Sequence, residues 1–142
     1  MYKDRTDKKL FYKEVNYKYI LTVPFSYKTS IRLKGYIISG LVTLWTSGEL
    51  VCEKGYAWDG PSGPTWDSRC AMRAALVHDA LYQLMRNGVL DHKYRKVADK
   101  IFYQILKEDG MNWLRRLLWW RAVRRFAAYA IQPRDDSVKS AP

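Results

Sequence analysis

The chain has 142 residues, enough for one domain with a single hydrophobic core. Its 25 lysine and arginine residues against 14 aspartate and glutamate residues give a formal net charge of +11. This charge suits nucleic acid, anionic lipid or an acidic protein, or only a solvated basic surface. Cys52 and Cys70 are too few for a disulfide-stapled secreted fold, so we expect two ordinary buried or half-buried thiols.

The amino-terminal stretch "MYKDRTDKKL" has no apolar segment behind its charges, as a secretory signal would have. No stretch reaches the roughly 18 apolar residues of a membrane span. We therefore expect a protein that stays in a cytoplasm. Residues 1–16 are charged and tyrosine-rich without a clear period, and we expect an arm that becomes ordered only on a partner.

Strand-like runs follow, rich in β-branched and aromatic residues. Pro24 indicates that the first strand is an edge strand or ends there. Ser47 and Gly48 have the chemistry of a tight hairpin turn. The runs that we expect to form strands are residues 19–25, 31–39, 41–45 and 49–58.

After a loop rich in glycine and proline, the apolar period becomes helical. We expect helices over residues 67–86 and 92–109 and a third that ends before Pro133. A short link makes the first two helices an antiparallel pair. Strands first and helices afterwards predict a single α+β domain over residues 17–131, followed by a disordered tail at 132–142.

The first two expected helices carry a candidate catalytic pair. His78 and Tyr82 are one helical turn apart and share a face, whereas Asp79 points about 100° away. Asp99 lies at the same level of the second helix as His78 does of the first, so the spacing permits a hydrogen bond between them. Such a bond would fix the imidazole tautomer, as a catalytic base requires. Asp79 would remain available for a hard cation, together with loop carbonyls.

A purely structural interpretation of these residues stays open, and a second enzyme class is disfavoured. A His–Asp pair between packed helices also suits a purely structural role, with "WDGPSGP" as a simple strand-to-helix connection. Metal-dependent phosphohydrolases with a His-Asp doublet need a further histidine upstream, and none precedes His78. The sequence contains neither a Gly-x-Ser-x-Gly elbow nor a glycine-rich phosphate loop with lysine.

The order of "YAWDGPSG", "HDALY" and "ADKIF" resembles phospholipase A2, above all the disulfide-free domain of parvovirus capsid proteins. There, a Tyr-x-Gly-Pro-Gly calcium loop precedes a His-Asp-x-x-Tyr helix, and an Ala-Asp pair follows on the next helix. The chain as a whole also resembles a family of small phage and prophage proteins that share a "WDGxS…HDxLY…AD…F" run. That second resemblance implies a viral protein, in the host cytoplasm or in the virion.

The phospholipase resemblance implies Ca²⁺-dependent hydrolysis of a lipid ester. His78 would deprotonate the attacking water and Asp99 would orient His78, while Tyr82 and Tyr103 would hydrogen-bond Asp99. The Ca²⁺ would polarise the ester carbonyl. The implied calcium ligands are Asp79 and main-chain carbonyls near Trp58, Gly60 and Ser62 or Gly63, with Asp59 as an extra ligand or a turn residue. The loop is one residue longer than Gly-Pro-Gly. The alternative is a non-catalytic virion or host-interaction protein.

The segment "WLRRLLWWRAVRRF" combines tryptophan with arginine. This pairing suits a lipid interface, where indole lies at headgroup level and guanidinium meets phosphate, and it suits nucleic-acid backbones too. Apolar residues on several sides of the helix favour core packing with arginines that extend to solvent instead. The residues predicted for membrane or partner binding are Trp113, Arg115, Arg116, Trp119, Trp120, Arg121, Arg124 and Arg125.

Overall fold

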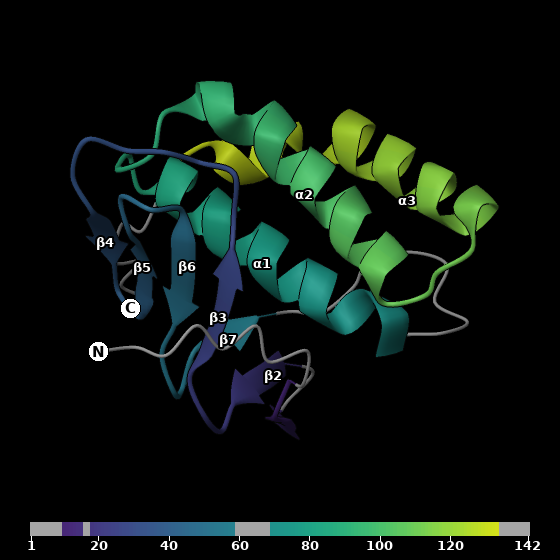
Figure 1. Cartoon of the computed structure of the whole chain (residues 1–142), viewed down its shortest axis with the longest axis horizontal. Helices are drawn as coiled ribbons and strands as arrows, with labels where there is room; N and C mark the ends of the chain where they lie inside the picture. The colour runs from purple at the N-terminus through teal and green to yellow at the C-terminus, as the bar shows by residue number, and fades with distance from the viewer. Residues whose placement is uncertain (1–9, 16–17, 59–68, 134–142) are drawn as a thin grey trace, which may run out of the picture.

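The computed structural model describes residues 10–15, 18–58 and 69–133, and the fold is α+β, as predicted. Short antiparallel strands come first and the helices follow (Figure 1). The strands are β1 (Tyr12–Val15), β2 (Lys18–Leu21), β3 (Phe25–Lys28), β4 (Ile37–Ser39), β5 (Val42–Leu44), β6 (Glu49–Cys52) and β7 (Ala57–Trp58). The helices are α1 (Arg69–Arg86), the 3-10 turn η1 (His92–Tyr94), α2 (Arg95–Glu108), α3 (Trp113–Phe126) and the 3-10 turn η2 (Ala127–Ile131).

The strands form two sheets, with orders β1-β2-β7 and β3-β6-β5-β4. Two of the predicted strand runs are therefore divided between sheets. The chain leaves β2 after Leu21, and Pro24, which cannot donate to a strand ladder, lies before β3. The run over 49–58 breaks at Gly55, whose φ of 92° turns the chain from β6 into β7. A continuous apolar run conceals such turns because apolar side chains line both strands.

The expectations for residues 31–39 and for the arm differ from the structure. Only β4 is a strand within 31–39, because the hydroxyl of Thr29 forms main-chain hydrogen bonds that a neighbouring strand would otherwise form. It donates to the carbonyl of Gly48 at 2.6 Å and accepts from the N–H of Ile31 at 3.2 Å. At the amino terminus, β1 pairs with β2, so the last part of the expected arm is a strand. Residues 1–9 lie outside the described residues.

The β5–β6 hairpin turns at Gly48, as predicted. The N–H of Trp45 donates to the carbonyl of Glu49, and the N–H of Gly48 donates to the carbonyl of Trp45. Gly48 has a φ of 93°, and a Cβ there would lie 2.5 Å from the carbonyl oxygens of Thr29 and Ile31. Only glycine fits this turn, because both the backbone angle and the space exclude a side chain.

The helix ends follow the capping signals of the sequence. Gly88, with a φ of 77°, ends α1, and Gly110, with a φ of 90°, follows α2. The side chain of Asp91 caps η1, so the second helix begins with a 3-10 turn before α2. Asn112 caps α3, which becomes a 3-10 turn at its carboxyl end, before Pro133.

The helices are stacked in order on the strands. In Figure 1, α1 lies between the strands and α2, and α3 lies on the outer side of α2. One apolar core runs through these layers and includes Leu44, Leu50, Leu81 and Ile105. Burial raises the pKa of the Cys52 thiol, and Cys70 is half-buried, in agreement with the prediction for the cysteines. Among the described helices, none is both long and apolar enough to cross a bilayer.

Candidate functional site

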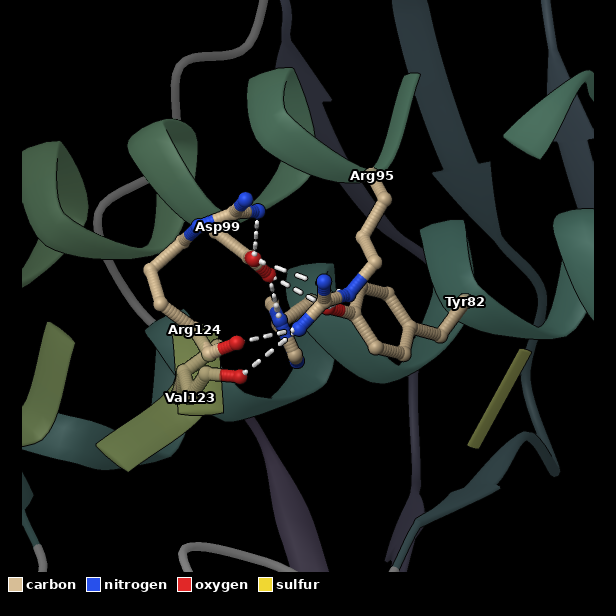
Figure 2. A network of polar contacts seen from close by, with 6 residues as sticks. Tyr82, Arg95, Asp99, Val123 and Arg124 are labelled. Atoms are coloured by element: carbon tan, nitrogen blue, oxygen red, sulfur yellow. Dashed lines mark hydrogen bonds and ion pairs between the residues drawn. The ribbon is translucent and has the colours of Figure 1, made fainter. Parts of the chain in front are cut away.

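The predicted His78–Asp99 hydrogen bond is present at the centre of the helix stack. Asp99 of α2 is wholly buried, and its Oδ1 lies 2.7 Å from Nε2 of His78 on α1. The hydroxyl of Tyr82, also on α1, donates to the same oxygen. Nη1 of Arg124 reaches Oδ2 from α3 at 2.7 Å (Figure 2). One carboxylate thus joins all three α-helices.

The environment of Asp99 keeps it ionised. Burial alone would raise the pKa of its carboxyl, but the hydrogen bonds from His78, Tyr82 and Arg124 outweigh burial and lower it. Burial raises the pKa of Tyr82, and the hydrogen bond to Asp99 raises it further, so the phenol stays a donor. Because an ionised carboxylate only accepts, Nε2 of His78 must carry the proton. The lone pair of neutral His78 is therefore on Nδ1, where a base would need it.

Arg95 forms a second layer around this cluster. Its Nε donates to the hydroxyl of Tyr82 at 3.2 Å, and lies 4.0 Å from Oδ2 of Asp99. Its Nη2 donates to the main-chain carbonyls of Arg124 at 2.6 Å and Val123 at 3.3 Å (Figure 2). A guanidinium is favourable at these carbonyls because they form the negative end of α3. Arg95 therefore fixes the position of α3 relative to the His–Asp pair.

Aromatic rings enclose the imidazole. The ring of His78 lies 4.0 Å from that of Tyr82 and 5.2 Å from that of Phe102, measured between centroids. Phe102 in turn contacts Trp119 at 6.2 Å. Trp119 is buried, which corrects the prediction that it belongs to a partner-binding surface. An indole at this position completes the apolar wall of the site instead.

Tyr103 does not take the role that the resemblance implies. Among the described residues, Asp99 is bonded by His78, Tyr82 and Arg124, and the ring of Tyr103 lies under the guanidinium of Arg116 at 5.4 Å. The physical reason is that a guanidinium is a stronger donor to a carboxylate than a phenol is. The second carboxylate oxygen of Asp99, Oδ2, is therefore bonded by Arg124 and not by Tyr103.

Arg95 and Arg124 are the site residues that sequence reasoning missed in this role. Arg95 precedes Asp99 by one helical turn, a spacing that predicts contact on one helix face, so it could have been found. Arg124 comes from a different helix, and no local spacing connects it with Asp99. We expected Arg124 on a binding surface, and the structure turns it inward to an ion pair instead.

The calcium prediction rests mainly on residues outside the described ranges. Asp59, Gly60, Ser62 and Gly63 all lie there. Of the remaining predicted ligands, Asp79 is half-buried on α1, next to His78 in the chain. Trp58 is buried on β7, and its indole N–H has no hydrogen-bond partner among the described residues. In the parts of the chain that the structure describes, no three histidine, cysteine or acidic side chains group as metal ligands do. Calcium binding stays a prediction.

The other predicted binding residues of α3 divide between two environments. Trp113, Arg121 and Arg125 are exposed. Arg115, Arg116 and Trp120 are half-buried, with Nη1 of Arg116 donating to the carbonyl of Met111. Nη2 of Arg115 and Nε of Arg116 are buried, so these two guanidinium groups pack against the fold and do not extend to solvent as the core-packing alternative expected. The exposed residues leave one side of α3 available to a partner.

Comparison with known proteins gives one match. Neither the curated proteins nor the solved structures include a significant match to the chain. Residues 45–123 match the family described as "Protein of unknown function (DUF1353)". The matched region contains both His78 and Asp99 and ends one residue before Arg124. Since it spans more than half of the sequence, the chain belongs to the DUF1353 family.

Proposed function

We propose that this protein hydrolyses a carboxylic ester of a lipid, with His78 as the general base. The observation that carries the proposal is the bond between Nε2 of His78 and the ionised Asp99, which leaves Nδ1 as the basic nitrogen. The similarity of the motifs to phospholipase A2 supplies the substrate class. The resemblance of the whole chain to phage proteins supplies the proposed setting, a virion or an infected host cell.

The proposed reaction moves one proton through Nδ1. His78 takes a proton from water, and the water oxygen adds to the ester carbonyl carbon. When the tetrahedral intermediate collapses, the carbon–oxygen bond to the alcohol breaks, and Nδ1 returns the proton to the departing alkoxide. Asp99 stabilises the intervening imidazolium. We also propose Ca²⁺, bound by Asp79 and loop residues 58–63, as the Lewis acid that would stabilise the oxyanion.

The direct test measures fatty acid release from vesicles. Purified protein is incubated with mixed anionic and zwitterionic phospholipid vesicles, with Ca²⁺ or with a chelator. We expect Ca²⁺-dependent release, and we expect His78→Gln to reduce it by about 10²-fold or more, because a general base typically contributes this much. Glutamine retains a donor for Asp99, so the helix stack should survive the substitution.

The sequence offers a matched control for this test. His92 is the other histidine; it is exposed and bonds the main-chain carbonyl of Met85 at 3.0 Å. His92→Gln should leave the rate within about twofold of wild type, because His92 lies outside the Asp99 cluster. Equal rates for wild type and His78→Gln would rule out the proposed base. Release that a chelator does not change would remove Ca²⁺ from the proposal while leaving His78 in it.

One observation favours the alternative, a non-catalytic virion or host-interaction protein. Arg124 already pairs with Asp99 and offsets part of the negative charge that an imidazolium at His78 would use. In this case the cluster holds the helices together, and the basic aromatic surface binds a protein, membrane or nucleic acid; the nucleic acid rests on net charge alone. Absence of fatty acid release from every lipid mixture, together with a loss of folding stability in His78→Gln, would favour this alternative.

A further inference from the structure

The outer side of α3 carries large apolar side chains that the fold does not bury. Trp113 is 66% exposed, Leu114 51% and Leu118 54%. These three and Arg121, which is also exposed, form what we call the outer face of α3. The opposite side of the helix carries the buried Trp119, and Arg124, at the edge of the outer face, reaches inward to Asp99. The helix is therefore held by its inner side, and its outer face is open.

We infer that the outer face of α3 docks on the surface of an anionic phospholipid bilayer. Charge complementarity predicts an anionic partner, because the exposed charged residues of α3 are Arg121 and Arg125 and the helix contains no acidic residue. Leu114 and Leu118 favour a lipid over a nucleic acid as this partner. Transfer of leucine from water to an apolar environment is favourable, and a nucleic-acid backbone offers no such environment. A bilayer interface supplies both acyl chains for the apolar residues and headgroup phosphates for the arginines.

The geometry fits a helix that lies in the interface rather than one that crosses it. The helix has 14 residues, and none of the described helices is long and apolar enough to span a bilayer. The outer face is available without unfolding, because Arg95 and the Arg124–Asp99 pair anchor the inner side. Figure 1 shows α3 on the side of α2 away from α1 and the strands.

This inference deepens the proposed function, because it names the aggregate surface on which the ester would be presented. It rests on the proposed function only for the biological purpose of the docking. Binding itself is measured without hydrolysis. The experiment is co-sedimentation with vesicles of phosphatidylcholine alone and of phosphatidylcholine with phosphatidylglycerol, in the absence of Ca²⁺. Wild type and His78→Gln are both tested, so that a missing catalytic activity does not affect the result.

We expect binding to the anionic vesicles only, with equal affinity for wild type and His78→Gln. Leu114→Ser with Leu118→Ser should weaken binding by about tenfold or more, since both apolar anchors are lost. Arg121→Gln should weaken it by about fivefold, and added salt should weaken it further. The matched control is Ile38→Ser on β4, because Ile38 is 56% exposed but lies on another element. It should bind as wild type does.

Several outcomes would overturn the inference. Binding to neither vesicle, or equal binding to both, would exclude an anionic bilayer as the occupant. Weakening by Ile38→Ser as large as that of the leucine pair would show nonspecific adsorption. If the protein dimerises without vesicles and the leucine substitutions abolish the dimer, the occupant is a second copy of the chain. Vesicle binding without fatty acid release would keep the docking face and reject the hydrolase.

Discussion

Two charged clusters join α1 to α2, and they are built in opposite ways. At the middle of the pair, the acid is buried: Asp99 has no exposed surface and receives donors from around it. In the second cluster, nearer the start of α1, the buried group is a cation, the guanidinium of Arg73. The side chain of Arg73 is 7% exposed, and it reaches outward to Glu108 and Asp109, which are 35% and 19% exposed. We call the second group the Arg73 cluster, to which Tyr27 also belongs through a bond to Glu108.

The difference separates a buried cation from a buried anion. Burial would lower the pKa of Arg73, but the hydrogen bonds and charges of Asp109 and Glu108 outweigh it and raise the pKa, so the guanidinium stays charged. Burial and the nearby carboxylate of Glu108 raise the pKa of Tyr27 to about 12. The Arg73 cluster thus has static charges at neutral pH and suits a structural role. The Asp99 cluster instead has a buried carboxylate at its centre, and its hydrogen bonds lower the pKa of that carboxyl.

The largest expected effect comes from removing the buried acid. Asp99→Ala should lower the free energy of unfolding by about 3–5 kcal/mol, because it leaves Arg124 and Tyr82 without their common acceptor. Asp109→Ala should cost about 1 kcal/mol, since Arg73 keeps Glu108 and the lost carboxylate is partly solvated. Urea unfolding of both variants measures the contrast. Equal costs would show that the two clusters contribute alike.

The acid dependence of stability should come from the same carboxylate. The pKa of Asp99 is lowered on folding, so its contribution is fully present above its ordinary pKa of 3.8 and is lost as the pH falls through the lower, folded value. The stability difference between wild type and Asp99→Ala should therefore narrow as the pH is lowered from 5 towards 2. Urea midpoints across this range test it. A difference that stays constant would mean that Asp99 is not ionised in the folded protein.

A contact was easier to predict from the sequence when few residues or helices separate its partners. The hairpin turn at Ser47 and Gly48 was predicted, because its cause lies within a few residues. The His78–Asp99 bond was predictable because one short link fixes the register of two helices. Arg124 was not, since its position depends on how a third helix packs. The single strand expected over residues 49–58 was wrong for a local reason, because Gly55 turns the chain between β6 and β7 within a run that looks continuous.

Removal of single hydroxyls should give a smaller version of the same contrast. Tyr82→Phe deletes a buried donor to Asp99 and an acceptor for Nε of Arg95, and should cost about 1–2 kcal/mol. Tyr27→Phe deletes a longer, part-buried bond to Glu108 of 3.3 Å, and should cost about 0.5 kcal/mol. Thermal or urea unfolding of the two variants gives the comparison. A larger cost for Tyr27→Phe would place the tighter network at the Arg73 cluster.

The smallest effect should appear in alkali, where only the phenols distinguish the two clusters. The pKa of Tyr27 is raised from 10.0 to about 12, so its bond to Glu108 stabilises the fold fully below pH 10 and is lost as the pH rises towards 12. Tyr27→Phe should remove this part of the alkaline loss of stability. The phenolate absorbance difference between wild type and the variant isolates Tyr27 among eleven tyrosines. Titration near pH 10 would mean that water reaches Tyr27. The Arg73 cluster would then be a solvated surface network, and the contrast with Asp99 would be one of burial alone.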